Sequence, residues 1–110
     1  MKKEHHLEKR KVAVVTGAER GIGRAVVCAL AASGMDVVIA YHKDAKAGTT
    51  LARELDGLGI RAIALQADVS DFASCRALAA AVKKEFGRCD VLVNNAGVLK
   101  DKTLAKMTKA

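Results

Sequence analysis

The residues best suited to binding chemistry form a short glycine-rich segment near the start of the chain. An apolar run, Val12–Val15, precedes this segment, and an apolar stretch with helical spacing follows it. The segment itself reads Thr16-Gly17-Ala18-Glu19-Arg20-Gly21-Ile22-Gly23. A glycine loop between a strand and a helix offers backbone N–H groups and the positive end of the helix dipole to an anion. The arrangement therefore predicts a site for the pyrophosphate of a dinucleotide.

Each glycine of this loop has a separate expected role. Gly17 should permit a tight turn off the strand, and Gly21 should let the backbone approach a phosphate. Gly23 should let the helix pack closely on the sheet. The spacing G-x-x-x-G-x-G differs from G-x-G-x-x-G, and the G-K-[ST] of a P-loop is missing from it. Glycines alone often only turn or cap a chain, so the flanking strand and helix carry this prediction.

Strand-like and helix-like stretches alternate along the chain and must position the loop. Four apolar, mostly β-branched runs are typical of parallel strands covered on both faces: Val12–Val15, Asp36–Ala40, Ala62–Leu65 and Val91–Val93. Alternation of strands and helices implies right-handed crossovers. We therefore expect an α/β fold with a Rossmann-type, doubly wound parallel sheet of about four strands in the order 3-2-1-4.

Three helices are expected between the strands. The first has the stripe Ile22, Ala25, Val26, Ala29 and Leu30 and ends near Gly34. The second has Leu51, Leu55 and Leu58 and ends between residues 57 and 59. The third follows Ser70 as its N-cap, with Asp71 in its first turn, and has the stripe Phe72, Cys75, Ala79, Val82 and Phe86 before Gly87. A fourth helix would begin at Thr103–Ala110.

Composition narrows the class of protein. The chain has 110 residues, 51% of them hydrophobic, so it forms at most one small domain with a modest core. No apolar run approaches the ~20 residues of a membrane span. Charged and polar residues follow Lys2 and Lys3 where a signal peptide needs an apolar segment. We expect a cytoplasmic protein without a membrane partner, organised as a basic tail over residues 1–10 and a domain over residues 11–110.

Neither a metal site nor a nucleic-acid site is expected. The three cysteines, Cys28, Cys75 and Cys89, lack C-x-x-C spacing and are interpreted as reduced thiols. The adjacent His5 and His6 are poorly placed to share one ion. The net charge of +7 leaves a basic nucleic-acid binder as an alternative, but many of the lysines lie near the two ends of the chain. One tyrosine, two phenylalanines and no tryptophan provide no stacking platform for bases.

Three motifs in order carry a resemblance to a known family. They are Thr16-Gly17-x-x-x-Gly21-Ile22-Gly23, then Asp68-Val69, then Asn94-Asn95-Ala96-Gly97. Their order after the first, third and fourth expected strands resembles the signature of the short-chain dehydrogenase/reductase family, over residues 11–110. The residues around Ala18-Glu19-Arg20 and the segment from Gly97 to Leu104 are most similar to 3-oxoacyl-acyl-carrier-protein reductases, with acetoacetyl-CoA reductases a close second.

The resemblance implies a role for each motif residue. Gly17, Ala18, Glu19, Arg20, Gly21, Ile22 and Gly23 would bracket the adenine ribose and the pyrophosphate. Asp68 would accept a hydrogen bond from the adenine amino group, with Val69 beside the ring; the alternative for Asp68 is a turn residue at a strand end. Asn95, Ala96 and Gly97 would line the ribose side of the cleft. Asn94 would brace the sheet, and Thr16 would tie the first strand to that motif.

The end of the second strand favours NADP(H) over NAD(H). An acid there would bind the ribose 2′-hydroxyl and repel a 2′-phosphate. Asp36 stands at the start of that strand, and Tyr41 occupies the position where NAD users of the family carry Asp. His42, Lys43 and Arg20 can supply positive charge instead. Asp44 and Glu19 are negative charges nearby, and the alternative for the cations is ordinary solvated charge.

The catalytic residues of the family have no counterpart in these 110 residues. The resemblance implies a Ser, a Tyr-x-x-x-Lys pair and an Asn, all expected beyond Ala110. We therefore expect the N-terminal, NADP-binding half of a Rossmann domain, truncated before the catalytic region. The full-length protein would be a homo-oligomer that reduces a 3-oxoacyl thioester to its 3-hydroxyacyl form, whereas this chain would only bind the cofactor. The alternative is a non-catalytic dinucleotide-binding module or a split-enzyme subunit.

Overall fold

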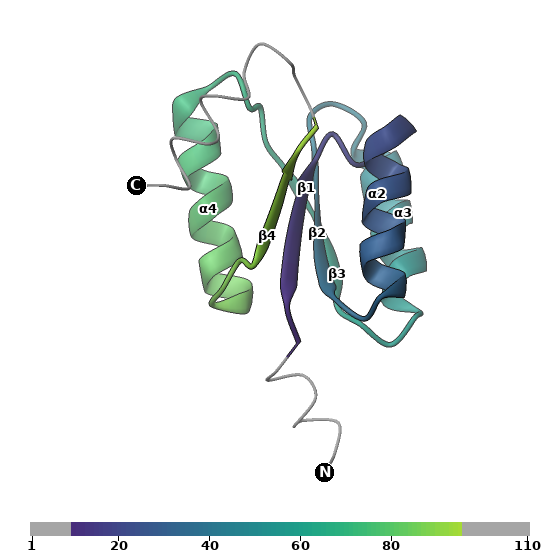
Figure 1. Ribbon diagram of the computed structural model, residues 1–110. Coiled ribbons are helices and arrows are strands. Elements are labelled where there is room, and N and C mark those ends of the chain that lie inside the picture. Colours follow the sequence, from purple (N-terminus) through teal and green to yellow (C-terminus); the bar gives the residue numbers. More distant parts are fainter. Residues whose placement is uncertain (1–9, 96–110) are drawn as a thin grey trace.

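A parallel sheet with a helix after each of its first three strands organises the protein. The computed structural model describes residues 10–95. Its elements in chain order are β1 (Val12–Thr16), α2 (Gly21–Ala32), β2 (Asp36–Tyr41), α3 (Ala45–Asp56), β3 (Ala62–Gln66), α4 (Phe72–Phe86) and β4 (Val91–Asn94). The four strands are parallel and lie in the order β3-β2-β1-β4, which confirms the predicted topology (Figure 1). The fourth helix expected at Thr103–Ala110 lies outside the described residues.

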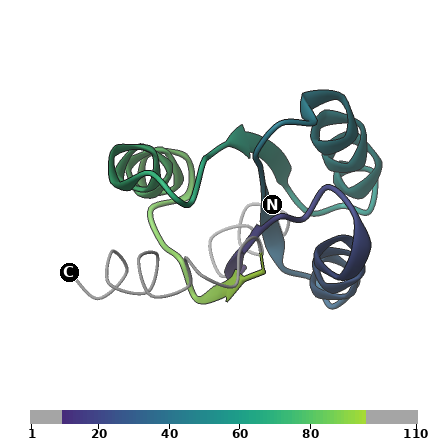
Figure 2. The same cartoon turned by 90° about the horizontal axis from the view of Figure 1, so that it is seen from above.

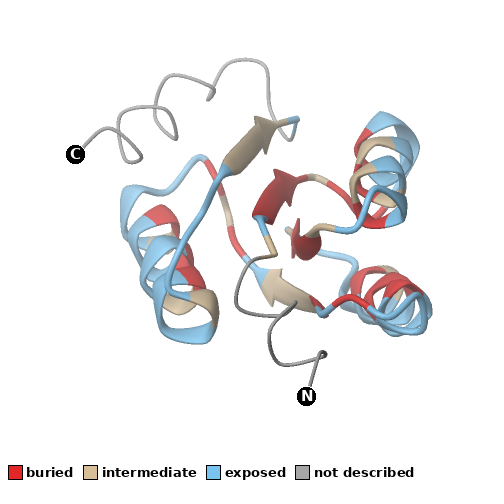
Figure 3. Cartoon of the chain, turned by 60° about the horizontal axis from the view of Figure 1, so that its bottom comes forward, coloured by how far each residue is buried: buried red, intermediate tan, exposed pale blue. Residues whose placement is uncertain are grey.

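The helices form layers on both faces of the sheet. Helices α2 and α3 cover one face, and α4 covers the other (Figure 2). Side chains of β1 and β2 alternate between the two faces: Val15 and Ile39 pack in the core beneath α2 and α3, whereas Val14 and Val38 pack beneath α4. Burial is concentrated on these two central strands, while β3 and β4 are mostly half-buried (Figure 3). The near-continuous apolar character of β1 and β2 thus reflects coverage on both faces.

The buried face of α2 lies one residue later than the expected stripe. Gly23, Val27 and Ala31 are buried, whereas the expected Ile22, Ala25 and Ala29 are exposed. Val26 and Leu30 of the expected stripe are half-buried and pack against the core, so the stripe is confirmed in part. Arg24 is the one charged residue of this helix. A helix that is apolar on nearly every side gives a periodicity that does not select one face, which explains the error.

The N-cap and part of the stripe expected for α4 are also wrong. Asp71, not Ser70, caps the helix, and its Oδ2 accepts a hydrogen bond from Ser74 N at 3.2 Å. Leu78 is buried in the core, whereas Phe72 is 55% exposed. Serine and aspartate are both good N-caps, so their adjacency left the boundary open by one residue.

The strand register brings four chain segments to one edge of the sheet. Thr16 at the end of β1 pairs with Ala40 in β2 and with Asn94 in β4. Tyr41 at the end of β2 pairs with Gln66 at the end of β3. Because all strands are parallel, the segments that follow them meet at this carboxyl edge, where open α/β sheets bind their ligands. In the part of the chain that the structure describes, no helix has the length and apolar character to cross a membrane.

Candidate functional site

A cavity of about 490 Å³ lies at the carboxyl edge of the sheet. Its lining residues come from the end of β2 and from the segments that follow the four strands: Gly17, Glu19, Arg20, Ala40, His42, Ala67, Asp68, Val69, Ser70 and Asn95. Among the other predicted site residues, Ala18 is fully buried, and Gly21, Ile22, Gly23 and Lys43 do not line the cavity. Ala96 and Gly97 lie outside the described residues. The three motifs that are distant in sequence therefore contribute to one cavity.

The glycine loop has the backbone that its sequence predicts. Gly17 and Gly21 both have a φ of 64°, in the left-handed region that favours glycine. A Cβ on Gly23 would lie 2.3 Å from the Gly17 carbonyl oxygen and 2.6 Å from Asn95 Nδ2. Gly23 thus permits the close packing expected of it, although the atoms it approaches belong to the loop and to Asn95 rather than to a strand.

The N-terminus of α2 lies beside the cavity, and no side-chain hydrogen bond from its N-cap residue caps it. Arg20 is the N-cap residue, with extended backbone, and among the described residues its side chain makes no capping hydrogen bond. The first turn of α2 contains no acidic residue. The unpaired N–H groups of a first helical turn and the helix dipole together favour an anion.

Thr16 and the two asparagines fasten β4 to β1 beside the loop. Thr16 Oγ1 donates to Asn94 Oδ1 at 3.2 Å and accepts from Asn95 N at 2.9 Å. Asn95 Nδ2 donates to the Gly17 carbonyl oxygen at 3.2 Å. Thr16 is 1% exposed, so its two bonds are partly shielded from water. The contacts confirm the expected roles of Thr16 as a tie and of Asn94 as a brace.

Asp68 forms a local turn and also faces the imidazole of His42. Its Oδ1 accepts hydrogen bonds from Ser70 Oγ at 2.6 Å and Ser70 N at 3.0 Å, so the turn interpretation holds for this oxygen. Its Oδ2 lies 3.6 Å from His42 Nε2. The two Ser70 bonds lower the pKa of Asp68, with smaller help from the charges of His42 and Lys43 against partial desolvation. The group is therefore an anionic acceptor at the cavity wall.

Two other acids, Asp44 and Asp36, are engaged outside the cavity. Asp44 caps α3, and its Oδ1 accepts from Ala47 N at 3.0 Å. Asp36 is buried at the start of β2, where its Oδ1 accepts from Arg61 N at 2.9 Å and lies 3.6 Å from Arg10 Nε. The expectation that Asp36 stands at the wrong end of its strand is confirmed.

Glu19, the acid of the glycine loop, is buried. It is 7% exposed, and its Oε1 is shielded from water without a hydrogen-bond partner among residues 10–95. Periodicity gives no signal for this burial, because the path of the loop, not a helix or strand pattern, determines it.

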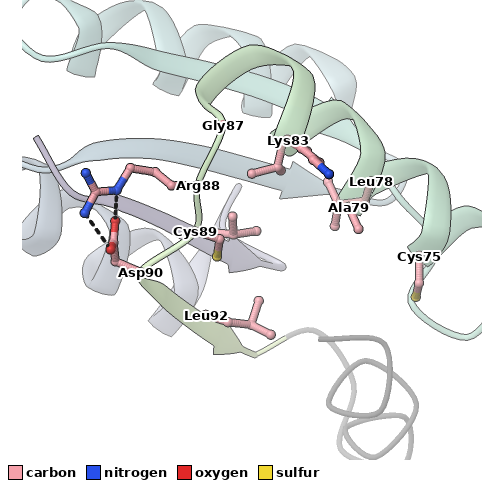
Figure 4. Close-up of a pocket in the computed structure, with 11 residues that line it drawn as sticks. Cys75, Leu78, Ala79, Lys83, Gly87, Arg88, Cys89, Asp90 and Leu92 are labelled. Atoms are coloured by element: carbon pink, nitrogen blue, oxygen red, sulfur yellow. Dashed lines mark hydrogen bonds and ion pairs between the residues drawn. The ribbon is translucent and has the colours of Figure 1, made fainter. Parts of the chain in front are cut away.

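A second cavity of about 430 Å³ lies between α4 and β4, and the sequence did not predict it. Leu78, Val82 and Leu92 give it an apolar wall, and the Arg88–Asp90 ion pair lies at one end (Figure 4). Cys75 also lines it, and burial raises the pKa of this thiol, with further help from Asp71 and Asp68. A thiol held in its protonated form is a poor nucleophile, so Cys75 is suited to packing.

The chain is similar in sequence to known proteins. The model of the short chain dehydrogenase family matches residues 11–110. The chain is 43% identical to an uncharacterized oxidoreductase of Methylorubrum extorquens over 90% of this chain and 40% of that protein. It is 44% identical to a 3-oxoacyl-[acyl-carrier-protein] reductase of Synechocystis over 88% of this chain and 39% of that protein.

The fold is likewise found among solved structures. A short chain dehydrogenase of Burkholderia cenocepacia, solved in complex with NADP, is 46% identical and superposes with a TM-score of 0.76. The match covers 80% of this chain and 36% of that one. The chain therefore spans about two fifths of the length of the relatives named above.

Proposed function

We propose that this chain, which belongs to the short chain dehydrogenase family, binds the adenosine end of NADP(H) in the cavity at the carboxyl edge of its sheet, called here the carboxyl-edge cavity. The observation that carries this proposal is the uncapped N-terminus of α2 beside a cavity built from the ends of all four strands. A pyrophosphate would accept hydrogen bonds from the first-turn N–H groups of α2. The bound cofactor would supply the hydride for reduction of a carbonyl group.

The lining residues fit the adenosine end of such a cofactor. The free side of the Asp68 carboxylate would accept a hydrogen bond from the adenine amino group, and the buried Val69 would lie beside the ring. Asn95, fixed through Thr16 and Gly17, would line the ribose side. Ala96 and Gly97 would extend this wall.

A preference for NADP(H) over NAD(H) follows from the charges that reach the cavity. Arg20 and His42 line it, and Lys43 lies close enough to influence Asp68. Tyr41 does not line it; its ring packs on α3 so closely that a Cβ on Gly48 would lie 2.8 Å from its Cδ2. Asp44 is occupied as the cap of α3, where its Oδ1 accepts from Ala47 N. Arg20 is therefore the residue best suited to hold a 2′-phosphate, because its guanidinium pairs with phosphate in a forked geometry.

The reaction proposed for the full-length protein is reduction of a 3-oxoacyl thioester, carried by acyl-carrier protein or coenzyme A. The similarity to a 3-oxoacyl-[acyl-carrier-protein] reductase over most of this chain supports it. The one tyrosine of the sequence, Tyr41, is followed four residues later by Ala45 and not by Lys. The 110-residue chain alone is therefore proposed to bind the cofactor without turnover.

A comparison of the two cofactors tests the proposed preference. Isothermal titration calorimetry on the purified chain should give a lower Kd for NADPH than for NADH. Arg20→Ala should reduce the ratio of the NADH Kd to the NADPH Kd about tenfold, because a charge-assisted bond to the 2′-phosphate is lost. Arg76→Ala, which removes an exposed arginine from α4, should leave the ratio unchanged. Equal affinity for NADH and NADPH, or an unchanged ratio in Arg20→Ala, would contradict the proposal.

A further inference from the structure

The end of β2 holds His42 at the carboxyl-edge cavity. The Tyr41 carbonyl oxygen accepts a hydrogen bond from Ala67 N at 2.8 Å, and the Tyr41 ring packs closely on Gly48 of α3. The His42 carbonyl oxygen accepts from Gln66 Nε2 at 3.0 Å. Both residues are therefore anchored through their backbone, and the His42 side chain lines the cavity.

The imidazole of His42 faces a carboxylate that keeps its charge at neutral pH. His42 Nε2 lies 3.6 Å from Asp68 Oδ2, a contact that is an ion pair only when the imidazole carries a proton. The other oxygen of Asp68 accepts from Ser70, and these bonds lower the pKa of Asp68 from its ordinary value of 3.8. Histidine is the side chain that ordinarily changes charge between pH 5 and 8. The charge of this pair therefore changes at neutral pH through His42.

The other charges near His42 are fixed over the same pH range. Charged groups of three segments lie around it: Asp68 after β3, Glu19 and Arg20 in the loop after β1, and Lys43 and Asp44 next to it in sequence. The segment after β4 contributes the uncharged Asn95 to the cavity. Arginine, lysine, aspartate and glutamate ordinarily titrate well outside pH 5 to 8. His42 is thus the group of this set whose type titrates near neutral pH.

We propose that the proton on His42 sets the strength of the preference for NADP(H) over NAD(H), an inference that rests on the proposed function. When protonated, His42 is a second cation beside Arg20 for the 2′-phosphate; when neutral, it leaves Arg20 to act alone. NAD(H) has a hydroxyl in place of this phosphate and gains little from the added charge. The preference therefore increases as the pH falls from about 8 toward 6.

The same coupling acts in the reverse direction. If the proton on His42 strengthens binding of the 2′-phosphate, the phosphate must equally favour the protonated imidazole, because coupling between two binding events is reciprocal. A nucleotide with a 2′-phosphate should therefore draw a proton onto His42 when it binds near neutral pH.

Two nucleotides that differ only at the 2′ position measure this effect. Calorimetric titrations between about pH 6 and pH 8 give the ratio of the Kd of adenosine 5′-monophosphate to the Kd of adenosine 2′,5′-bisphosphate. Toward pH 6, the ratio of the unchanged chain should rise to about ten times that of His42→Gln, which has no charge at this position. His42→Lys is charged throughout and should keep a high ratio up to pH 8.

Comparison among chains isolates the proton on His42 from other titrations. The phosphates of the nucleotides titrate identically in all experiments, so their contribution cancels between the unchanged chain and the variants. A chain with His5→Gln and His6→Gln lacks the other two histidines of the sequence and should keep the pH dependence.

A second measurement needs no variant at position 42. The unchanged chain is titrated near neutral pH in buffers of different ionisation enthalpy, which reports the number of protons taken up on binding. Uptake should be larger for the bisphosphate than for the monophosphate.

The outcomes distinguish this inference from the proposed function. A ratio whose pH profile in the unchanged chain matches that of His42→Gln, or equal proton uptake for the two nucleotides, overturns the role of His42 alone. Absence of binding of every nucleotide, NADPH included, overturns the proposed function and this inference with it. A profile that approaches that of His42→Lys toward pH 6, with the larger uptake for the bisphosphate, supports both.

Discussion

At the scale of single residues, Gly23 shows how closely the phosphate-binding loop is packed. The Gly17 carbonyl and the Asn95 amide both occupy space that a side chain at this position would need. Asn95 Nδ2 also donates to Gly17 O, so the two obstructing groups are bonded to each other. One obstructing group is the Gly17 backbone and the other is the hydrogen-bonded Asn95 side chain, so neither can move aside without a change in the loop or the loss of that bond.

Replacement of Gly23 by alanine should therefore disturb both stability and binding. A Cβ at 2.3 Å from the Gly17 oxygen forces the loop to shift, and overpacking of this kind typically destabilises by about 1–3 kcal/mol. Urea denaturation followed by circular dichroism measures the loss, and calorimetry with NADPH should show weakened binding. Gly57→Ala is the matched control, because Gly57 has a φ of −70° and its nearest obstruction is Glu54 O at 3.3 Å. Equal stability of both variants would contradict the packing described here.

At the scale of elements, Asp90 joins the beginnings of β4 and β1. It accepts hydrogen bonds from Val12 N at 2.9 Å and from Arg88 Nε and Nη2 at 2.7 and 2.8 Å. The Arg88 bond and then the Val12 bond lower the pKa of Asp90 to about 2 from an ordinary value of 3.8. A carboxyl whose pKa is depressed in the folded state stabilises that state above its unfolded pKa. This contribution is lost as the pH falls from about 4 toward 2.

The Asp90→Asn variant tests this connection between strands. We expect it to be less stable than the unchanged chain at pH 7, and the difference in unfolding free energy should shrink as the pH falls through that window. Denaturation curves at several pH values between 2 and 7 measure it. Glu54→Gln, on the exposed surface of α3, should show little difference at neutral pH. A stability difference for Asp90→Asn that is independent of pH would show that the carboxylate charge is not responsible.

The elements also show what the sequence could and could not predict. The strand starts and the order β3-β2-β1-β4 were predictable, because short β-branched runs alternate with helical stretches. The buried face of α2 was not, since Arg24 alone marks a polar side. Gly17 could be placed at the site from its loop between a strand and a helix, whereas Asp68 and Asn95 were assigned to it through the family resemblance. The burial of Glu19 and the groove beside α4 depend on tertiary packing, which leaves no periodic signal.

At the scale of the whole molecule, β4 is one of the two outer strands of the described sheet. It pairs with β1, and all four of its residues are half-buried. The second cavity, between β4 and α4, lies beside this strand and has an apolar wall that includes Leu92 of β4 (Figure 4). An outer strand with apolar flanks offers unpaired backbone groups and favours association with another chain.

Self-association of the 110-residue chain is the expected consequence. Sedimentation velocity over a range of protein concentrations should show dimers or larger species that increase with concentration. Calorimetry should show a broad unfolding transition of low cooperativity. A strictly monomeric chain that melts in one sharp transition would contradict this expectation.

The most direct test of the central claim maps where the cofactor binds. A ¹⁵N-labelled chain is titrated with NADPH, and amide chemical shifts are followed by nuclear magnetic resonance. We predict the largest shifts at Gly17, Glu19, Arg20, His42 and Asp68, which line the carboxyl-edge cavity. Shifts concentrated instead at the groove beside α4, around Lys83, Gly87 and Leu92, would contradict the assignment of the dinucleotide site.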